Sequence, residues 1–315
     1  MATVAFERGL HELGDGLFAY LQPDGTWGWS NAGLVTADGT AMLVDTLFDL
    51  RSARAMFEAL RPVTDRHPIG AAMNTHGNGD HCFGNQLLPE GIPVYATRAT
   101  DAELRATGPE VVGGLADLDD SPEWRAFWSR TIGRFDFSDV ELRPPTDTFD
   151  GRLNLTIGDR GVQLLEVGPA HTAGDTIVHV PDARVVFTGD ILFIDGTPIM
   201  WHGPLQNWLD ACDRILELGA RVLVPGHGPV TDESGVHDVQ RYLTYIRDEA
   251  RSRFDSGMDP EQAADDIDIS DFRDWGDPER IVVNVAMVYR ELDPSLPPLT
   301  RPAAFLAMAH WAARH

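Results

Sequence analysis

The chain has 315 residues, of which 43% are apolar and 9% aromatic, and its 49 acidic and 25 basic residues give a net charge of −24. This length and composition are those of a globular protein with a sizeable core, in one large domain or two small ones. The negative charge disfavours nucleic-acid binding, which needs a basic surface, so we expect no nucleic-acid partner.

The N-terminal part predicts an antiparallel start to a β-sheet. Residues 17–21 form a first apolar strand, and strands at 30–35 and 41–44 meet across an Asp-Gly turn at 38–39. Residues 52–60 then carry apolar side chains at helical spacing, which predicts a helix.

A short apolar strand at 69–74 leads into a loop that is rich in metal-binding side chains. His76, Asp80 and His81 lie within six residues among small neighbours, and Asn78 lies between them. Loop backbone can aim neighbouring side chains at one point, so these donors could converge on a cation. The alternative is a polar turn that happens to contain two histidines.

Three later stretches place further donors at the ends of predicted strands. His171 lies in a glycine-rich turn after the strand at 163–167, and two more apolar strands end on Asp190 and His227. Ligands gather at the ends of strands in α/β sheets, so donors from four stretches are expected at one edge. The sequence therefore predicts a metal site.

The C-terminal part is helical. A helix at 204–218 has a buried apolar stripe that contains Cys212. Beyond residue 229, helices are expected to begin near 236, 259, 277 and 300. We place a catalytic domain at 1–235 and a helical extension at 236–315, which packs on the same domain and is a candidate homodimer surface.

In order and context, these motifs resemble the metallo-β-lactamase-fold superfamily over roughly residues 10–230. The family pattern is HxHxDH, a lone His, an Asp shared by two metals and a final His. Asn78 departs from it, because the family has its second histidine there. The resemblance implies an α/β fold, a four-layer αβ/βα sandwich. Residues 98–142, with helices predicted at 98–106 and 122–130, interrupt this pattern as a helical insertion, either a lid over the metal cleft or a helical pair packed on the scaffold.

The resemblance also implies two divalent metal ions, with zinc as the first choice and iron or manganese as alternatives. One site would be made by Asp80, His81, Asp190 and His227. The other would be made by His76, His171 and Asp190, with Asn78 in place of an imidazole, which would leave it weak or empty.

Three residues have expected roles beside the metals. Asp80 would orient the attacking hydroxide, and His202, on the loop after the Asp190 strand, could donate a proton to the leaving group. By the resemblance, Asp45 would lie behind the metals and orient a ligand histidine. The alternative for Asp45 is capping of the next segment.

The resulting function is a metal-dependent hydrolase of a small ester, lactone, thioester or amide, with a hydroxide bridging the metals. The alternative is a mononuclear iron oxygenase of the persulfide-dioxygenase type, using His76, His171 and Asp190. A third interpretation is a binding protein that has lost catalysis.

Compartment is inferred from cysteines and termini. Cys82 and Cys212 lie in unrelated contexts, which favours reduced thiols. The N-terminus lacks the basic and apolar regions of a signal peptide, and no stretch approaches the roughly 20 apolar residues of a membrane span. We expect a cytoplasmic enzyme with a small-molecule substrate and no membrane partner.

Overall fold

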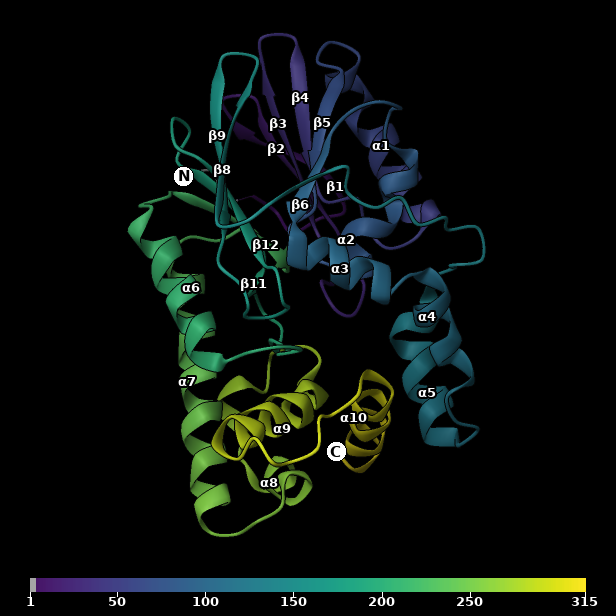
Figure 1. Ribbon diagram of the computed structural model, residues 1–315, viewed down its shortest axis with the longest axis vertical. Helices are drawn as coiled ribbons and strands as arrows, with labels where there is room; N and C mark the ends of the chain where they lie inside the picture. The colour runs from purple at the N-terminus through teal and green to yellow at the C-terminus, as the bar shows by residue number, and fades with distance from the viewer. Residues whose placement is uncertain (1–3) are drawn as a thin grey trace.

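A computed structural model describes residues 4–315 of the chain. Two β-sheets face each other, and helices cover their outer faces (Figure 1). The larger sheet consists, in spatial order, of β1 (Gly9–Gly14), β2 (Leu17–Leu21), β3 (Ala32–Ala37), β4 (Thr40–Val44), β5 (Ile69–Met73), β6 (Val94–Thr97) and β7 (Asp147–Phe149). The smaller sheet consists of β12 (Val222–His227), β11 (Val185–Phe193), β10 (Thr176–Val180), β9 (Arg160–Glu166) and β8 (Arg152–Ile157).

Each sheet combines antiparallel and parallel pairing. β1 to β4 pair antiparallel, and the predicted hairpin between β3 and β4 is present, with Asp38 and Gly39 both at positive φ. β4 to β7 pair parallel. In the smaller sheet, only the β11–β12 pair is parallel. Because β5, β11 and β12 end at the same side of the sandwich, the segments that carry the predicted donors come together there.

Ten α-helices occur among the described residues. They are α1 (Leu50–Thr64), α2 (Gly79–Cys82), α3 (Arg98–Ala106), α4 (Pro109–Gly114), α5 (Pro122–Arg130), α6 (Leu205–Glu217), α7 (Glu233–Asp255), α8 (Pro260–Asp266), α9 (Ile281–Leu292) and α10 (Arg301–Arg314). None of the helices within residues 4–315 is both long and apolar enough to cross a membrane.

Apolar faces define the layers. Val35, Val44 and Phe187 belong to a buried cluster between the two sheets. α1 packs Met56 and Leu60 against the other face of the larger sheet, and α6 covers the outer face of the smaller sheet. Burial of apolar surface on both faces of both sheets stabilises this four-layer arrangement, and the predicted αβ/βα sandwich is confirmed.

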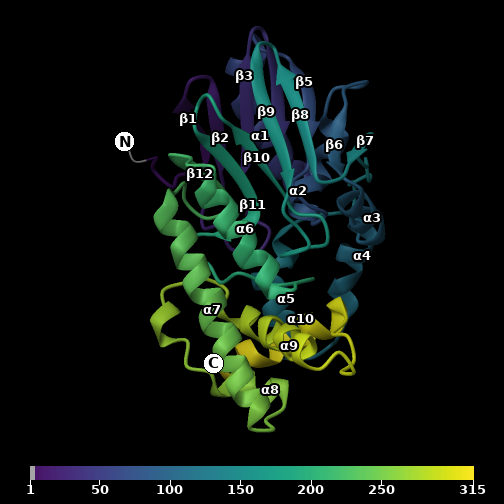
Figure 2. The same ribbon diagram turned by 60° about the vertical axis from the view of Figure 1, so that its left-hand side comes forward.

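The last helices lie below the sandwich and complete one end of it. In both views, α8 to α10 lie beneath the sheets, and Figure 1 shows α10 facing α4 and α5 (Figures 1 and 2). Thr300 caps α10 as predicted, its side chain accepting a hydrogen bond from the backbone N–H of Ala303. Contacts between α10 and α5 bring the helical extension and the insertion at 98–142 together.

The structure corrects three details of the expected elements. α1 runs from Leu50 to Thr64 and is longer than expected at both ends. It begins earlier because Asp49 caps it and accepts from the N–H of Ser52. The insertion contains an additional helix, α4, between the two predicted ones. β11 does not end on Asp190 but continues to Phe193, with an irregular register against β12.

Candidate metal centre

Six donor side chains from both sheets converge at one edge of the sandwich. His76 follows β5, Asp80 and His81 lie in the short helix α2, and His171 lies in the loop after β9. Asp190 lies within β11, and His227 is the last residue of β12. The donors form two groups that could each hold a metal ion, namely His76, His171 and Asp190, and Asp80, His81 and His227.

All four histidines present the same ring nitrogen to the site. Their Nδ1 atoms are engaged by Oγ1 of Thr75 for His76, Oδ2 of Asp45 for His81, the carbonyl of Ile199 for His171 and the carbonyl of Gly25 for His227. A carbonyl or carboxylate oxygen only accepts, so Nδ1 carries the proton in His81, His171 and His227. The hydroxyl of Thr75 donates to Asp45, which makes it an acceptor for His76. Each Nε2 atom is thereby turned toward the site, where it could bind a metal ion.

Asp190 lies between the two groups of imidazoles. Its Oδ2 is 3.3 Å from Nε2 of His171 and 3.6 Å from Nε2 of His76, while its Oδ1 is 3.1 Å from Nε2 of His81. Oδ2 is also 3.5 Å from Nε2 of His227. One carboxylate therefore presents its two oxygens to donors of both groups.

The donor set fits bound metal ions. Nε2 of His76, Nε2 of His81 and Oδ1 of Asp190 are buried and have no hydrogen-bond partner. Leaving buried polar atoms unpaired costs free energy, and a cation between them would remove that cost. Gly226 adds a steric requirement, because a Cβ atom at that position would overlap Oδ1 of Asp190.

In the metal-free protein the site titrates as a cluster. Burial would raise the pKa of both carboxyl groups, but the imidazoles hold the pKa of Asp190 well below its usual range and lower that of Asp80 to about 2. Burial would lower the pKa of His81 and His227, but the carboxylates raise the pKa of His227 to about 9 and that of His81 well above its ordinary value. Protons on these two rings therefore supply positive charge where cations would bind.

Asn78 lies between His171 and Arg301. Its Nδ2 donates to Nε2 of His171 at 2.9 Å, and its Oδ1 accepts from Nη2 of Arg301 at 3.3 Å. A guanidinium can only donate, so the amide oxygen faces Arg301 and the NH₂ faces the imidazole. The oxygen that would bind a metal is thus engaged by a cationic side chain.

The structure does not bring His202 to the donors. This side chain is exposed, its Nδ1 lies 3.1 Å from the carbonyl of the next residue, Gly203, and it does not line the cavity beside the donors. Its neighbour Trp201 does line that cavity, as does Trp27, whereas Trp29 packs on Phe135.

A cavity of about 770 Å³, including the part open to solvent, adjoins the donors. Its walls come from the sandwich, from the insertion at 98–142 and from α10. Apolar side chains predominate, among them Trp27, Phe48, Val111, Val112, Leu115, Ile132, Phe193, Ile199, Trp201 and Phe305. Asp80, His171, Asp190 and His227 lie at one end, and two arginines, Arg280 and Arg301, complete the lining.

Sequence reasoning missed the contribution of α10 to this site. Arg301 is 223 positions from Asn78, and nothing local in the sequence indicates that it reaches the metal donors. The only available signal was the helix start at Thr300, which places Arg301 in the first turn of α10.

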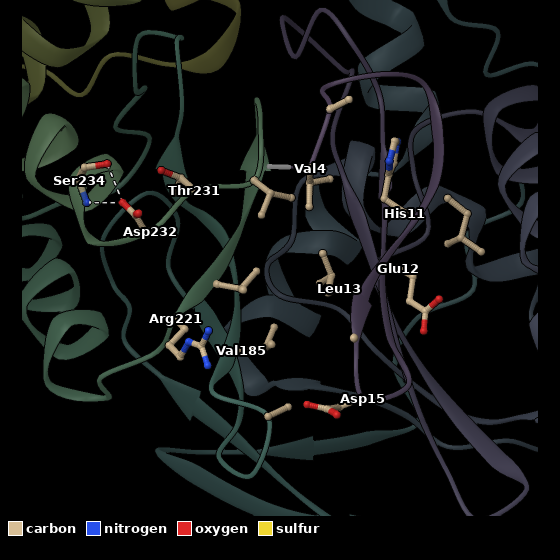
Figure 3. Close-up of a pocket in the computed structure, with 16 residues that line it drawn as sticks. Val4, His11, Glu12, Leu13, Asp15, Val185, Arg221, Thr231, Asp232 and Ser234 are labelled. Carbon is tan, nitrogen blue, oxygen red and sulfur yellow. Dashed lines mark hydrogen bonds between the residues drawn. The ribbon is translucent and has the colours of Figure 1, made fainter. Parts of the chain in front are cut away.

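A larger cavity lies at another place in the fold, where the edge strands β1 and β12 approach each other (Figure 3). Glu12 and Asp15 lie on one side of it, and Arg221 and Asp232 on the other (Figure 3). Within residues 4–315, both groups that could hold a metal ion lie outside this cavity. We therefore place the catalytic site at the smaller cavity, which adjoins the metal donors.

The two facing sheets and the donors at their edge define the class of αβ/βα metalloenzymes. The family model of the Metallo-beta-lactamase superfamily matches residues 25–227, and the chain belongs to that superfamily. It is an enzyme of the hydrolase type found in this family, and it is a metal-binding protein. The resemblance seen in the sequence is thereby confirmed.

Curated relatives have several substrates. The acyl-coenzyme A thioesterase MBLAC2 of Homo sapiens is 28% identical over 234 residues, which are 68% of this chain and 79% of the relative. A linear primary-alkylsulfatase of Pseudomonas is 24% identical over 74% of this chain and 49% of its own. A hydroxyacylglutathione hydrolase of Brucella ovis is 27% identical over 49% of this chain and 46% of its own.

Solved structures show the same fold. The sec-alkylsulfatase Pisa1 of Pseudomonas has a TM-score of 0.67 at 17% identity and covers 92% of this chain, although this chain spans only 51% of that one. A metallo-beta-lactamase of Pontibacter korlensis has a TM-score of 0.56 at 17% identity, covering 76% of this chain and 99% of its own. Since the family match ends at residue 227, the larger coverage by the sulfatase includes part of the helical extension.

Proposed function

We propose that the chain is a cytoplasmic, metal-dependent hydrolase of a small ester, lactone, thioester or amide, and that it uses two divalent ions, zinc being the expected metal. The observation that carries the proposal is the position of Asp190, whose two oxygens face imidazoles of both donor groups. His76, His171 and Asp190 would hold one ion, and Asp80, His81, His227 and Asp190 the other.

The substrate class is supported by the cavity and by two relatives. Apolar walls next to a metal centre suit an acyl group, because burial of apolar surface favours its binding. The thioesterase and the hydroxyacylglutathione hydrolase are both named as enzymes that cleave acyl compounds.

The metal ions and Asp80 would have separate roles in the proposed hydrolysis. Bound metal ions would lower the pKa of water toward neutrality and polarise the carbonyl oxygen. Asp80 lines the cavity, with Oδ2 3.2 Å from Nε2 of His227, and its carboxylate accepts a hydrogen bond that orients the attacking water. The water oxygen bonds to the carbonyl carbon, and the bond from that carbon to the leaving oxygen, sulfur or nitrogen breaks. The leaving atom keeps the electron pair and takes a proton that the water has lost.

Metal analysis combined with an activity assay tests this proposal. Protein purified without added metal should contain zinc or manganese, and removal by a chelator should abolish hydrolysis of simple 4-nitrophenyl esters until metal is restored. Asp80→Asn should lower kcat strongly, whereas His202→Ala, at an exposed residue outside the cavity, should leave it unchanged. Iron near one equivalent, with oxygen consumption and no hydrolysis, would instead favour a mononuclear oxygenase.

A further inference from the structure

The cavity contains one arginine that is held in place but keeps donors available. Arg301 is the first residue of α10, and its Nη2 lies 2.7 Å from Oε1 of Glu103 and 3.3 Å from Oδ1 of Asn78. Its guanidinium carbon lies 4.7 Å from the centre of the Trp201 ring. Stacking and the ion pair fix the orientation of this side chain beside the metal donors.

Most of the donors of Arg301 are not used by the protein. A guanidinium has five N–H donors, and both hydrogen bonds of Arg301 within residues 4–315 come from Nη2. The side chain is 31% exposed, and it lines the same cavity as Asp80, His171 and Asp190. Nη1 and Nε are therefore available to an acceptor on a bound molecule.

The other arginine of the cavity is buried and is paired through both of its terminal nitrogens. The side chain of Arg280 is only 2% exposed, and its guanidinium carbon lies 4.3 Å from the centre of the Trp27 ring and 5.2 Å from that of Phe193. Its Nη1 donates to the carbonyl of Thr197, and its Nη2 pairs with Asp277 at 2.8 Å. Of the two, Arg301 is the side chain that a substrate can reach.

Glu103 keeps the cationic group balanced and positioned. Its Oε1 pairs with Arg301, and its Oε2 accepts from the backbone N–H of Ala173, in the loop that carries His171. The carboxylate of Glu103 and the net charge of −24 on the chain both reduce the attraction of polyanions to this cavity. A substrate with a single anionic group is therefore the best partner for Arg301.

We infer that the substrate is an acyl compound with a carboxylate on its acyl chain, which pairs with Arg301 while the apolar part of that chain lies against Val111, Leu115 and Phe305. The inference rests on the proposed function and names its substrate class. Arg301 acts as a specificity-determining residue, presented to the metal centre by the helical extension. A charged hydrogen bond in a partly desolvated cavity favours the anionic substrate over a neutral one of equal length.

The test compares two matched substrates, the 4-nitrophenyl monoester of glutaric acid and 4-nitrophenyl pentanoate. We expect the zinc-loaded enzyme to prefer the glutaric monoester in kcat/KM. Arg301→Gln should lower that preference on the order of 10- to 100-fold, mainly through KM, because a charged hydrogen bond is lost. Hydrolysis of the pentanoate should change little.

Two further variants separate charge from structure. Arg301→Lys keeps the charge and should restore part of the preference. Arg314→Gln, also on α10 but paired with Asp265 outside the cavity, should leave the preference unchanged. An unchanged preference in Arg301→Gln, with metal-dependent hydrolysis intact, would overturn this inference alone. Absence of hydrolysis of both esters by the zinc-loaded enzyme would overturn the proposed function, and with it this inference.

Discussion

Nδ1 of His81 donates a hydrogen bond to Oδ2 of Asp45 at 2.8 Å, directly behind the metal donors. Asp45 is 3% exposed, has a φ of +63°, and also accepts from the backbone N–H and the hydroxyl of Thr75. Aspartate tolerates the left-handed region better than most residues, and here that conformation lets one carboxylate orient the loop and His81 together. Asp49, rather than Asp45, caps α1.

Asp45→Ala should weaken zinc binding by about 10- to 100-fold, because His81 loses the partner that fixes its ring. Competition with a chromophoric chelator measures this. Asp49→Ala is the matched control, since loss of the cap of α1 should cost about 1 kcal/mol of stability without changing zinc affinity. Equal affinities in Asp45→Ala and the unmodified protein would contradict the assigned role.

Asp190→Ala should abolish hydrolysis and the pairing of metals together. The reason is that its two oxygens face donors of both groups, so each site loses a ligand at once. Metal content of the dialysed protein, by mass spectrometry, is the measurement. If the variant still holds two equivalents, Asp190 does not bridge the ions.

Asn78→His should raise occupancy of the site made by His76 and His171. In the unmodified protein the amide oxygen is engaged by Arg301, so we expect this site to be the weaker one. Calorimetric titration of zinc into the metal-free protein should then show two unequal steps. In Asn78→His the weaker step should tighten. Two equally tight steps in the unmodified protein would refute the asymmetry.

The effect of zinc on stability should depend on pH. In the folded, metal-free protein the pKa of His227 is about 9 and that of His81 is also raised, above the ordinary value of about 6.5. Their protonated rings therefore stabilise the metal-free fold below pH about 6.5, and this contribution is lost as the pH rises toward 9. Zinc must displace the same protons, so its affinity increases over that range. The Tm difference between zinc-loaded and metal-free protein should widen, and a constant difference would contradict the assignment.

Asn284 joins the helical extension to the metal centre. On α9, its Oδ1 accepts from the N–H of Met200 at 2.9 Å, and its Nδ2 donates to the carbonyl of Pro198 and the hydroxyl of Tyr242. Asn284→Ala leaves these buried groups unpaired and should lower the free energy of unfolding by about 1–3 kcal/mol, measured by urea denaturation. Zinc affinity should fall too, because the intervening residue Ile199 accepts from His171.

Tyr242→Phe is the control for that variant. It removes only the partner hydroxyl at 3.1 Å and leaves the loop contacts of Asn284 in place. A smaller loss of stability and an unchanged zinc affinity are expected. Equal effects of both variants would show that the bonds to the loop do not matter for the metal centre.

Local signals in the sequence were sufficient for most elements. Short apolar runs predicted β2 to β5, and the Asp-Gly pair at 38–39 predicted the turn between β3 and β4. Caps are equally local, as the first turn of α10 after Thr300 confirms. The prediction that β11 ends on Asp190 was wrong. The irregular pairing of β11 with β12 lets the strand continue past this donor, and pairing between strands is not a local property of the sequence.

The metal donors themselves could be predicted from the sequence. His76, His171, Asp190 and His227 lie in a strand or a few residues after one, and the apolar residues of these strands are recognisable in the sequence. What surrounds them was decided by the tertiary structure. His202, which directly follows the cavity residue Trp201, is exposed, whereas Arg301 reaches Asn78 from the far end of the chain. Spacing along the chain encodes periodic burial and caps, but contacts between distant segments depend on how helices pack, so only the folded chain brings α10 to the metal centre.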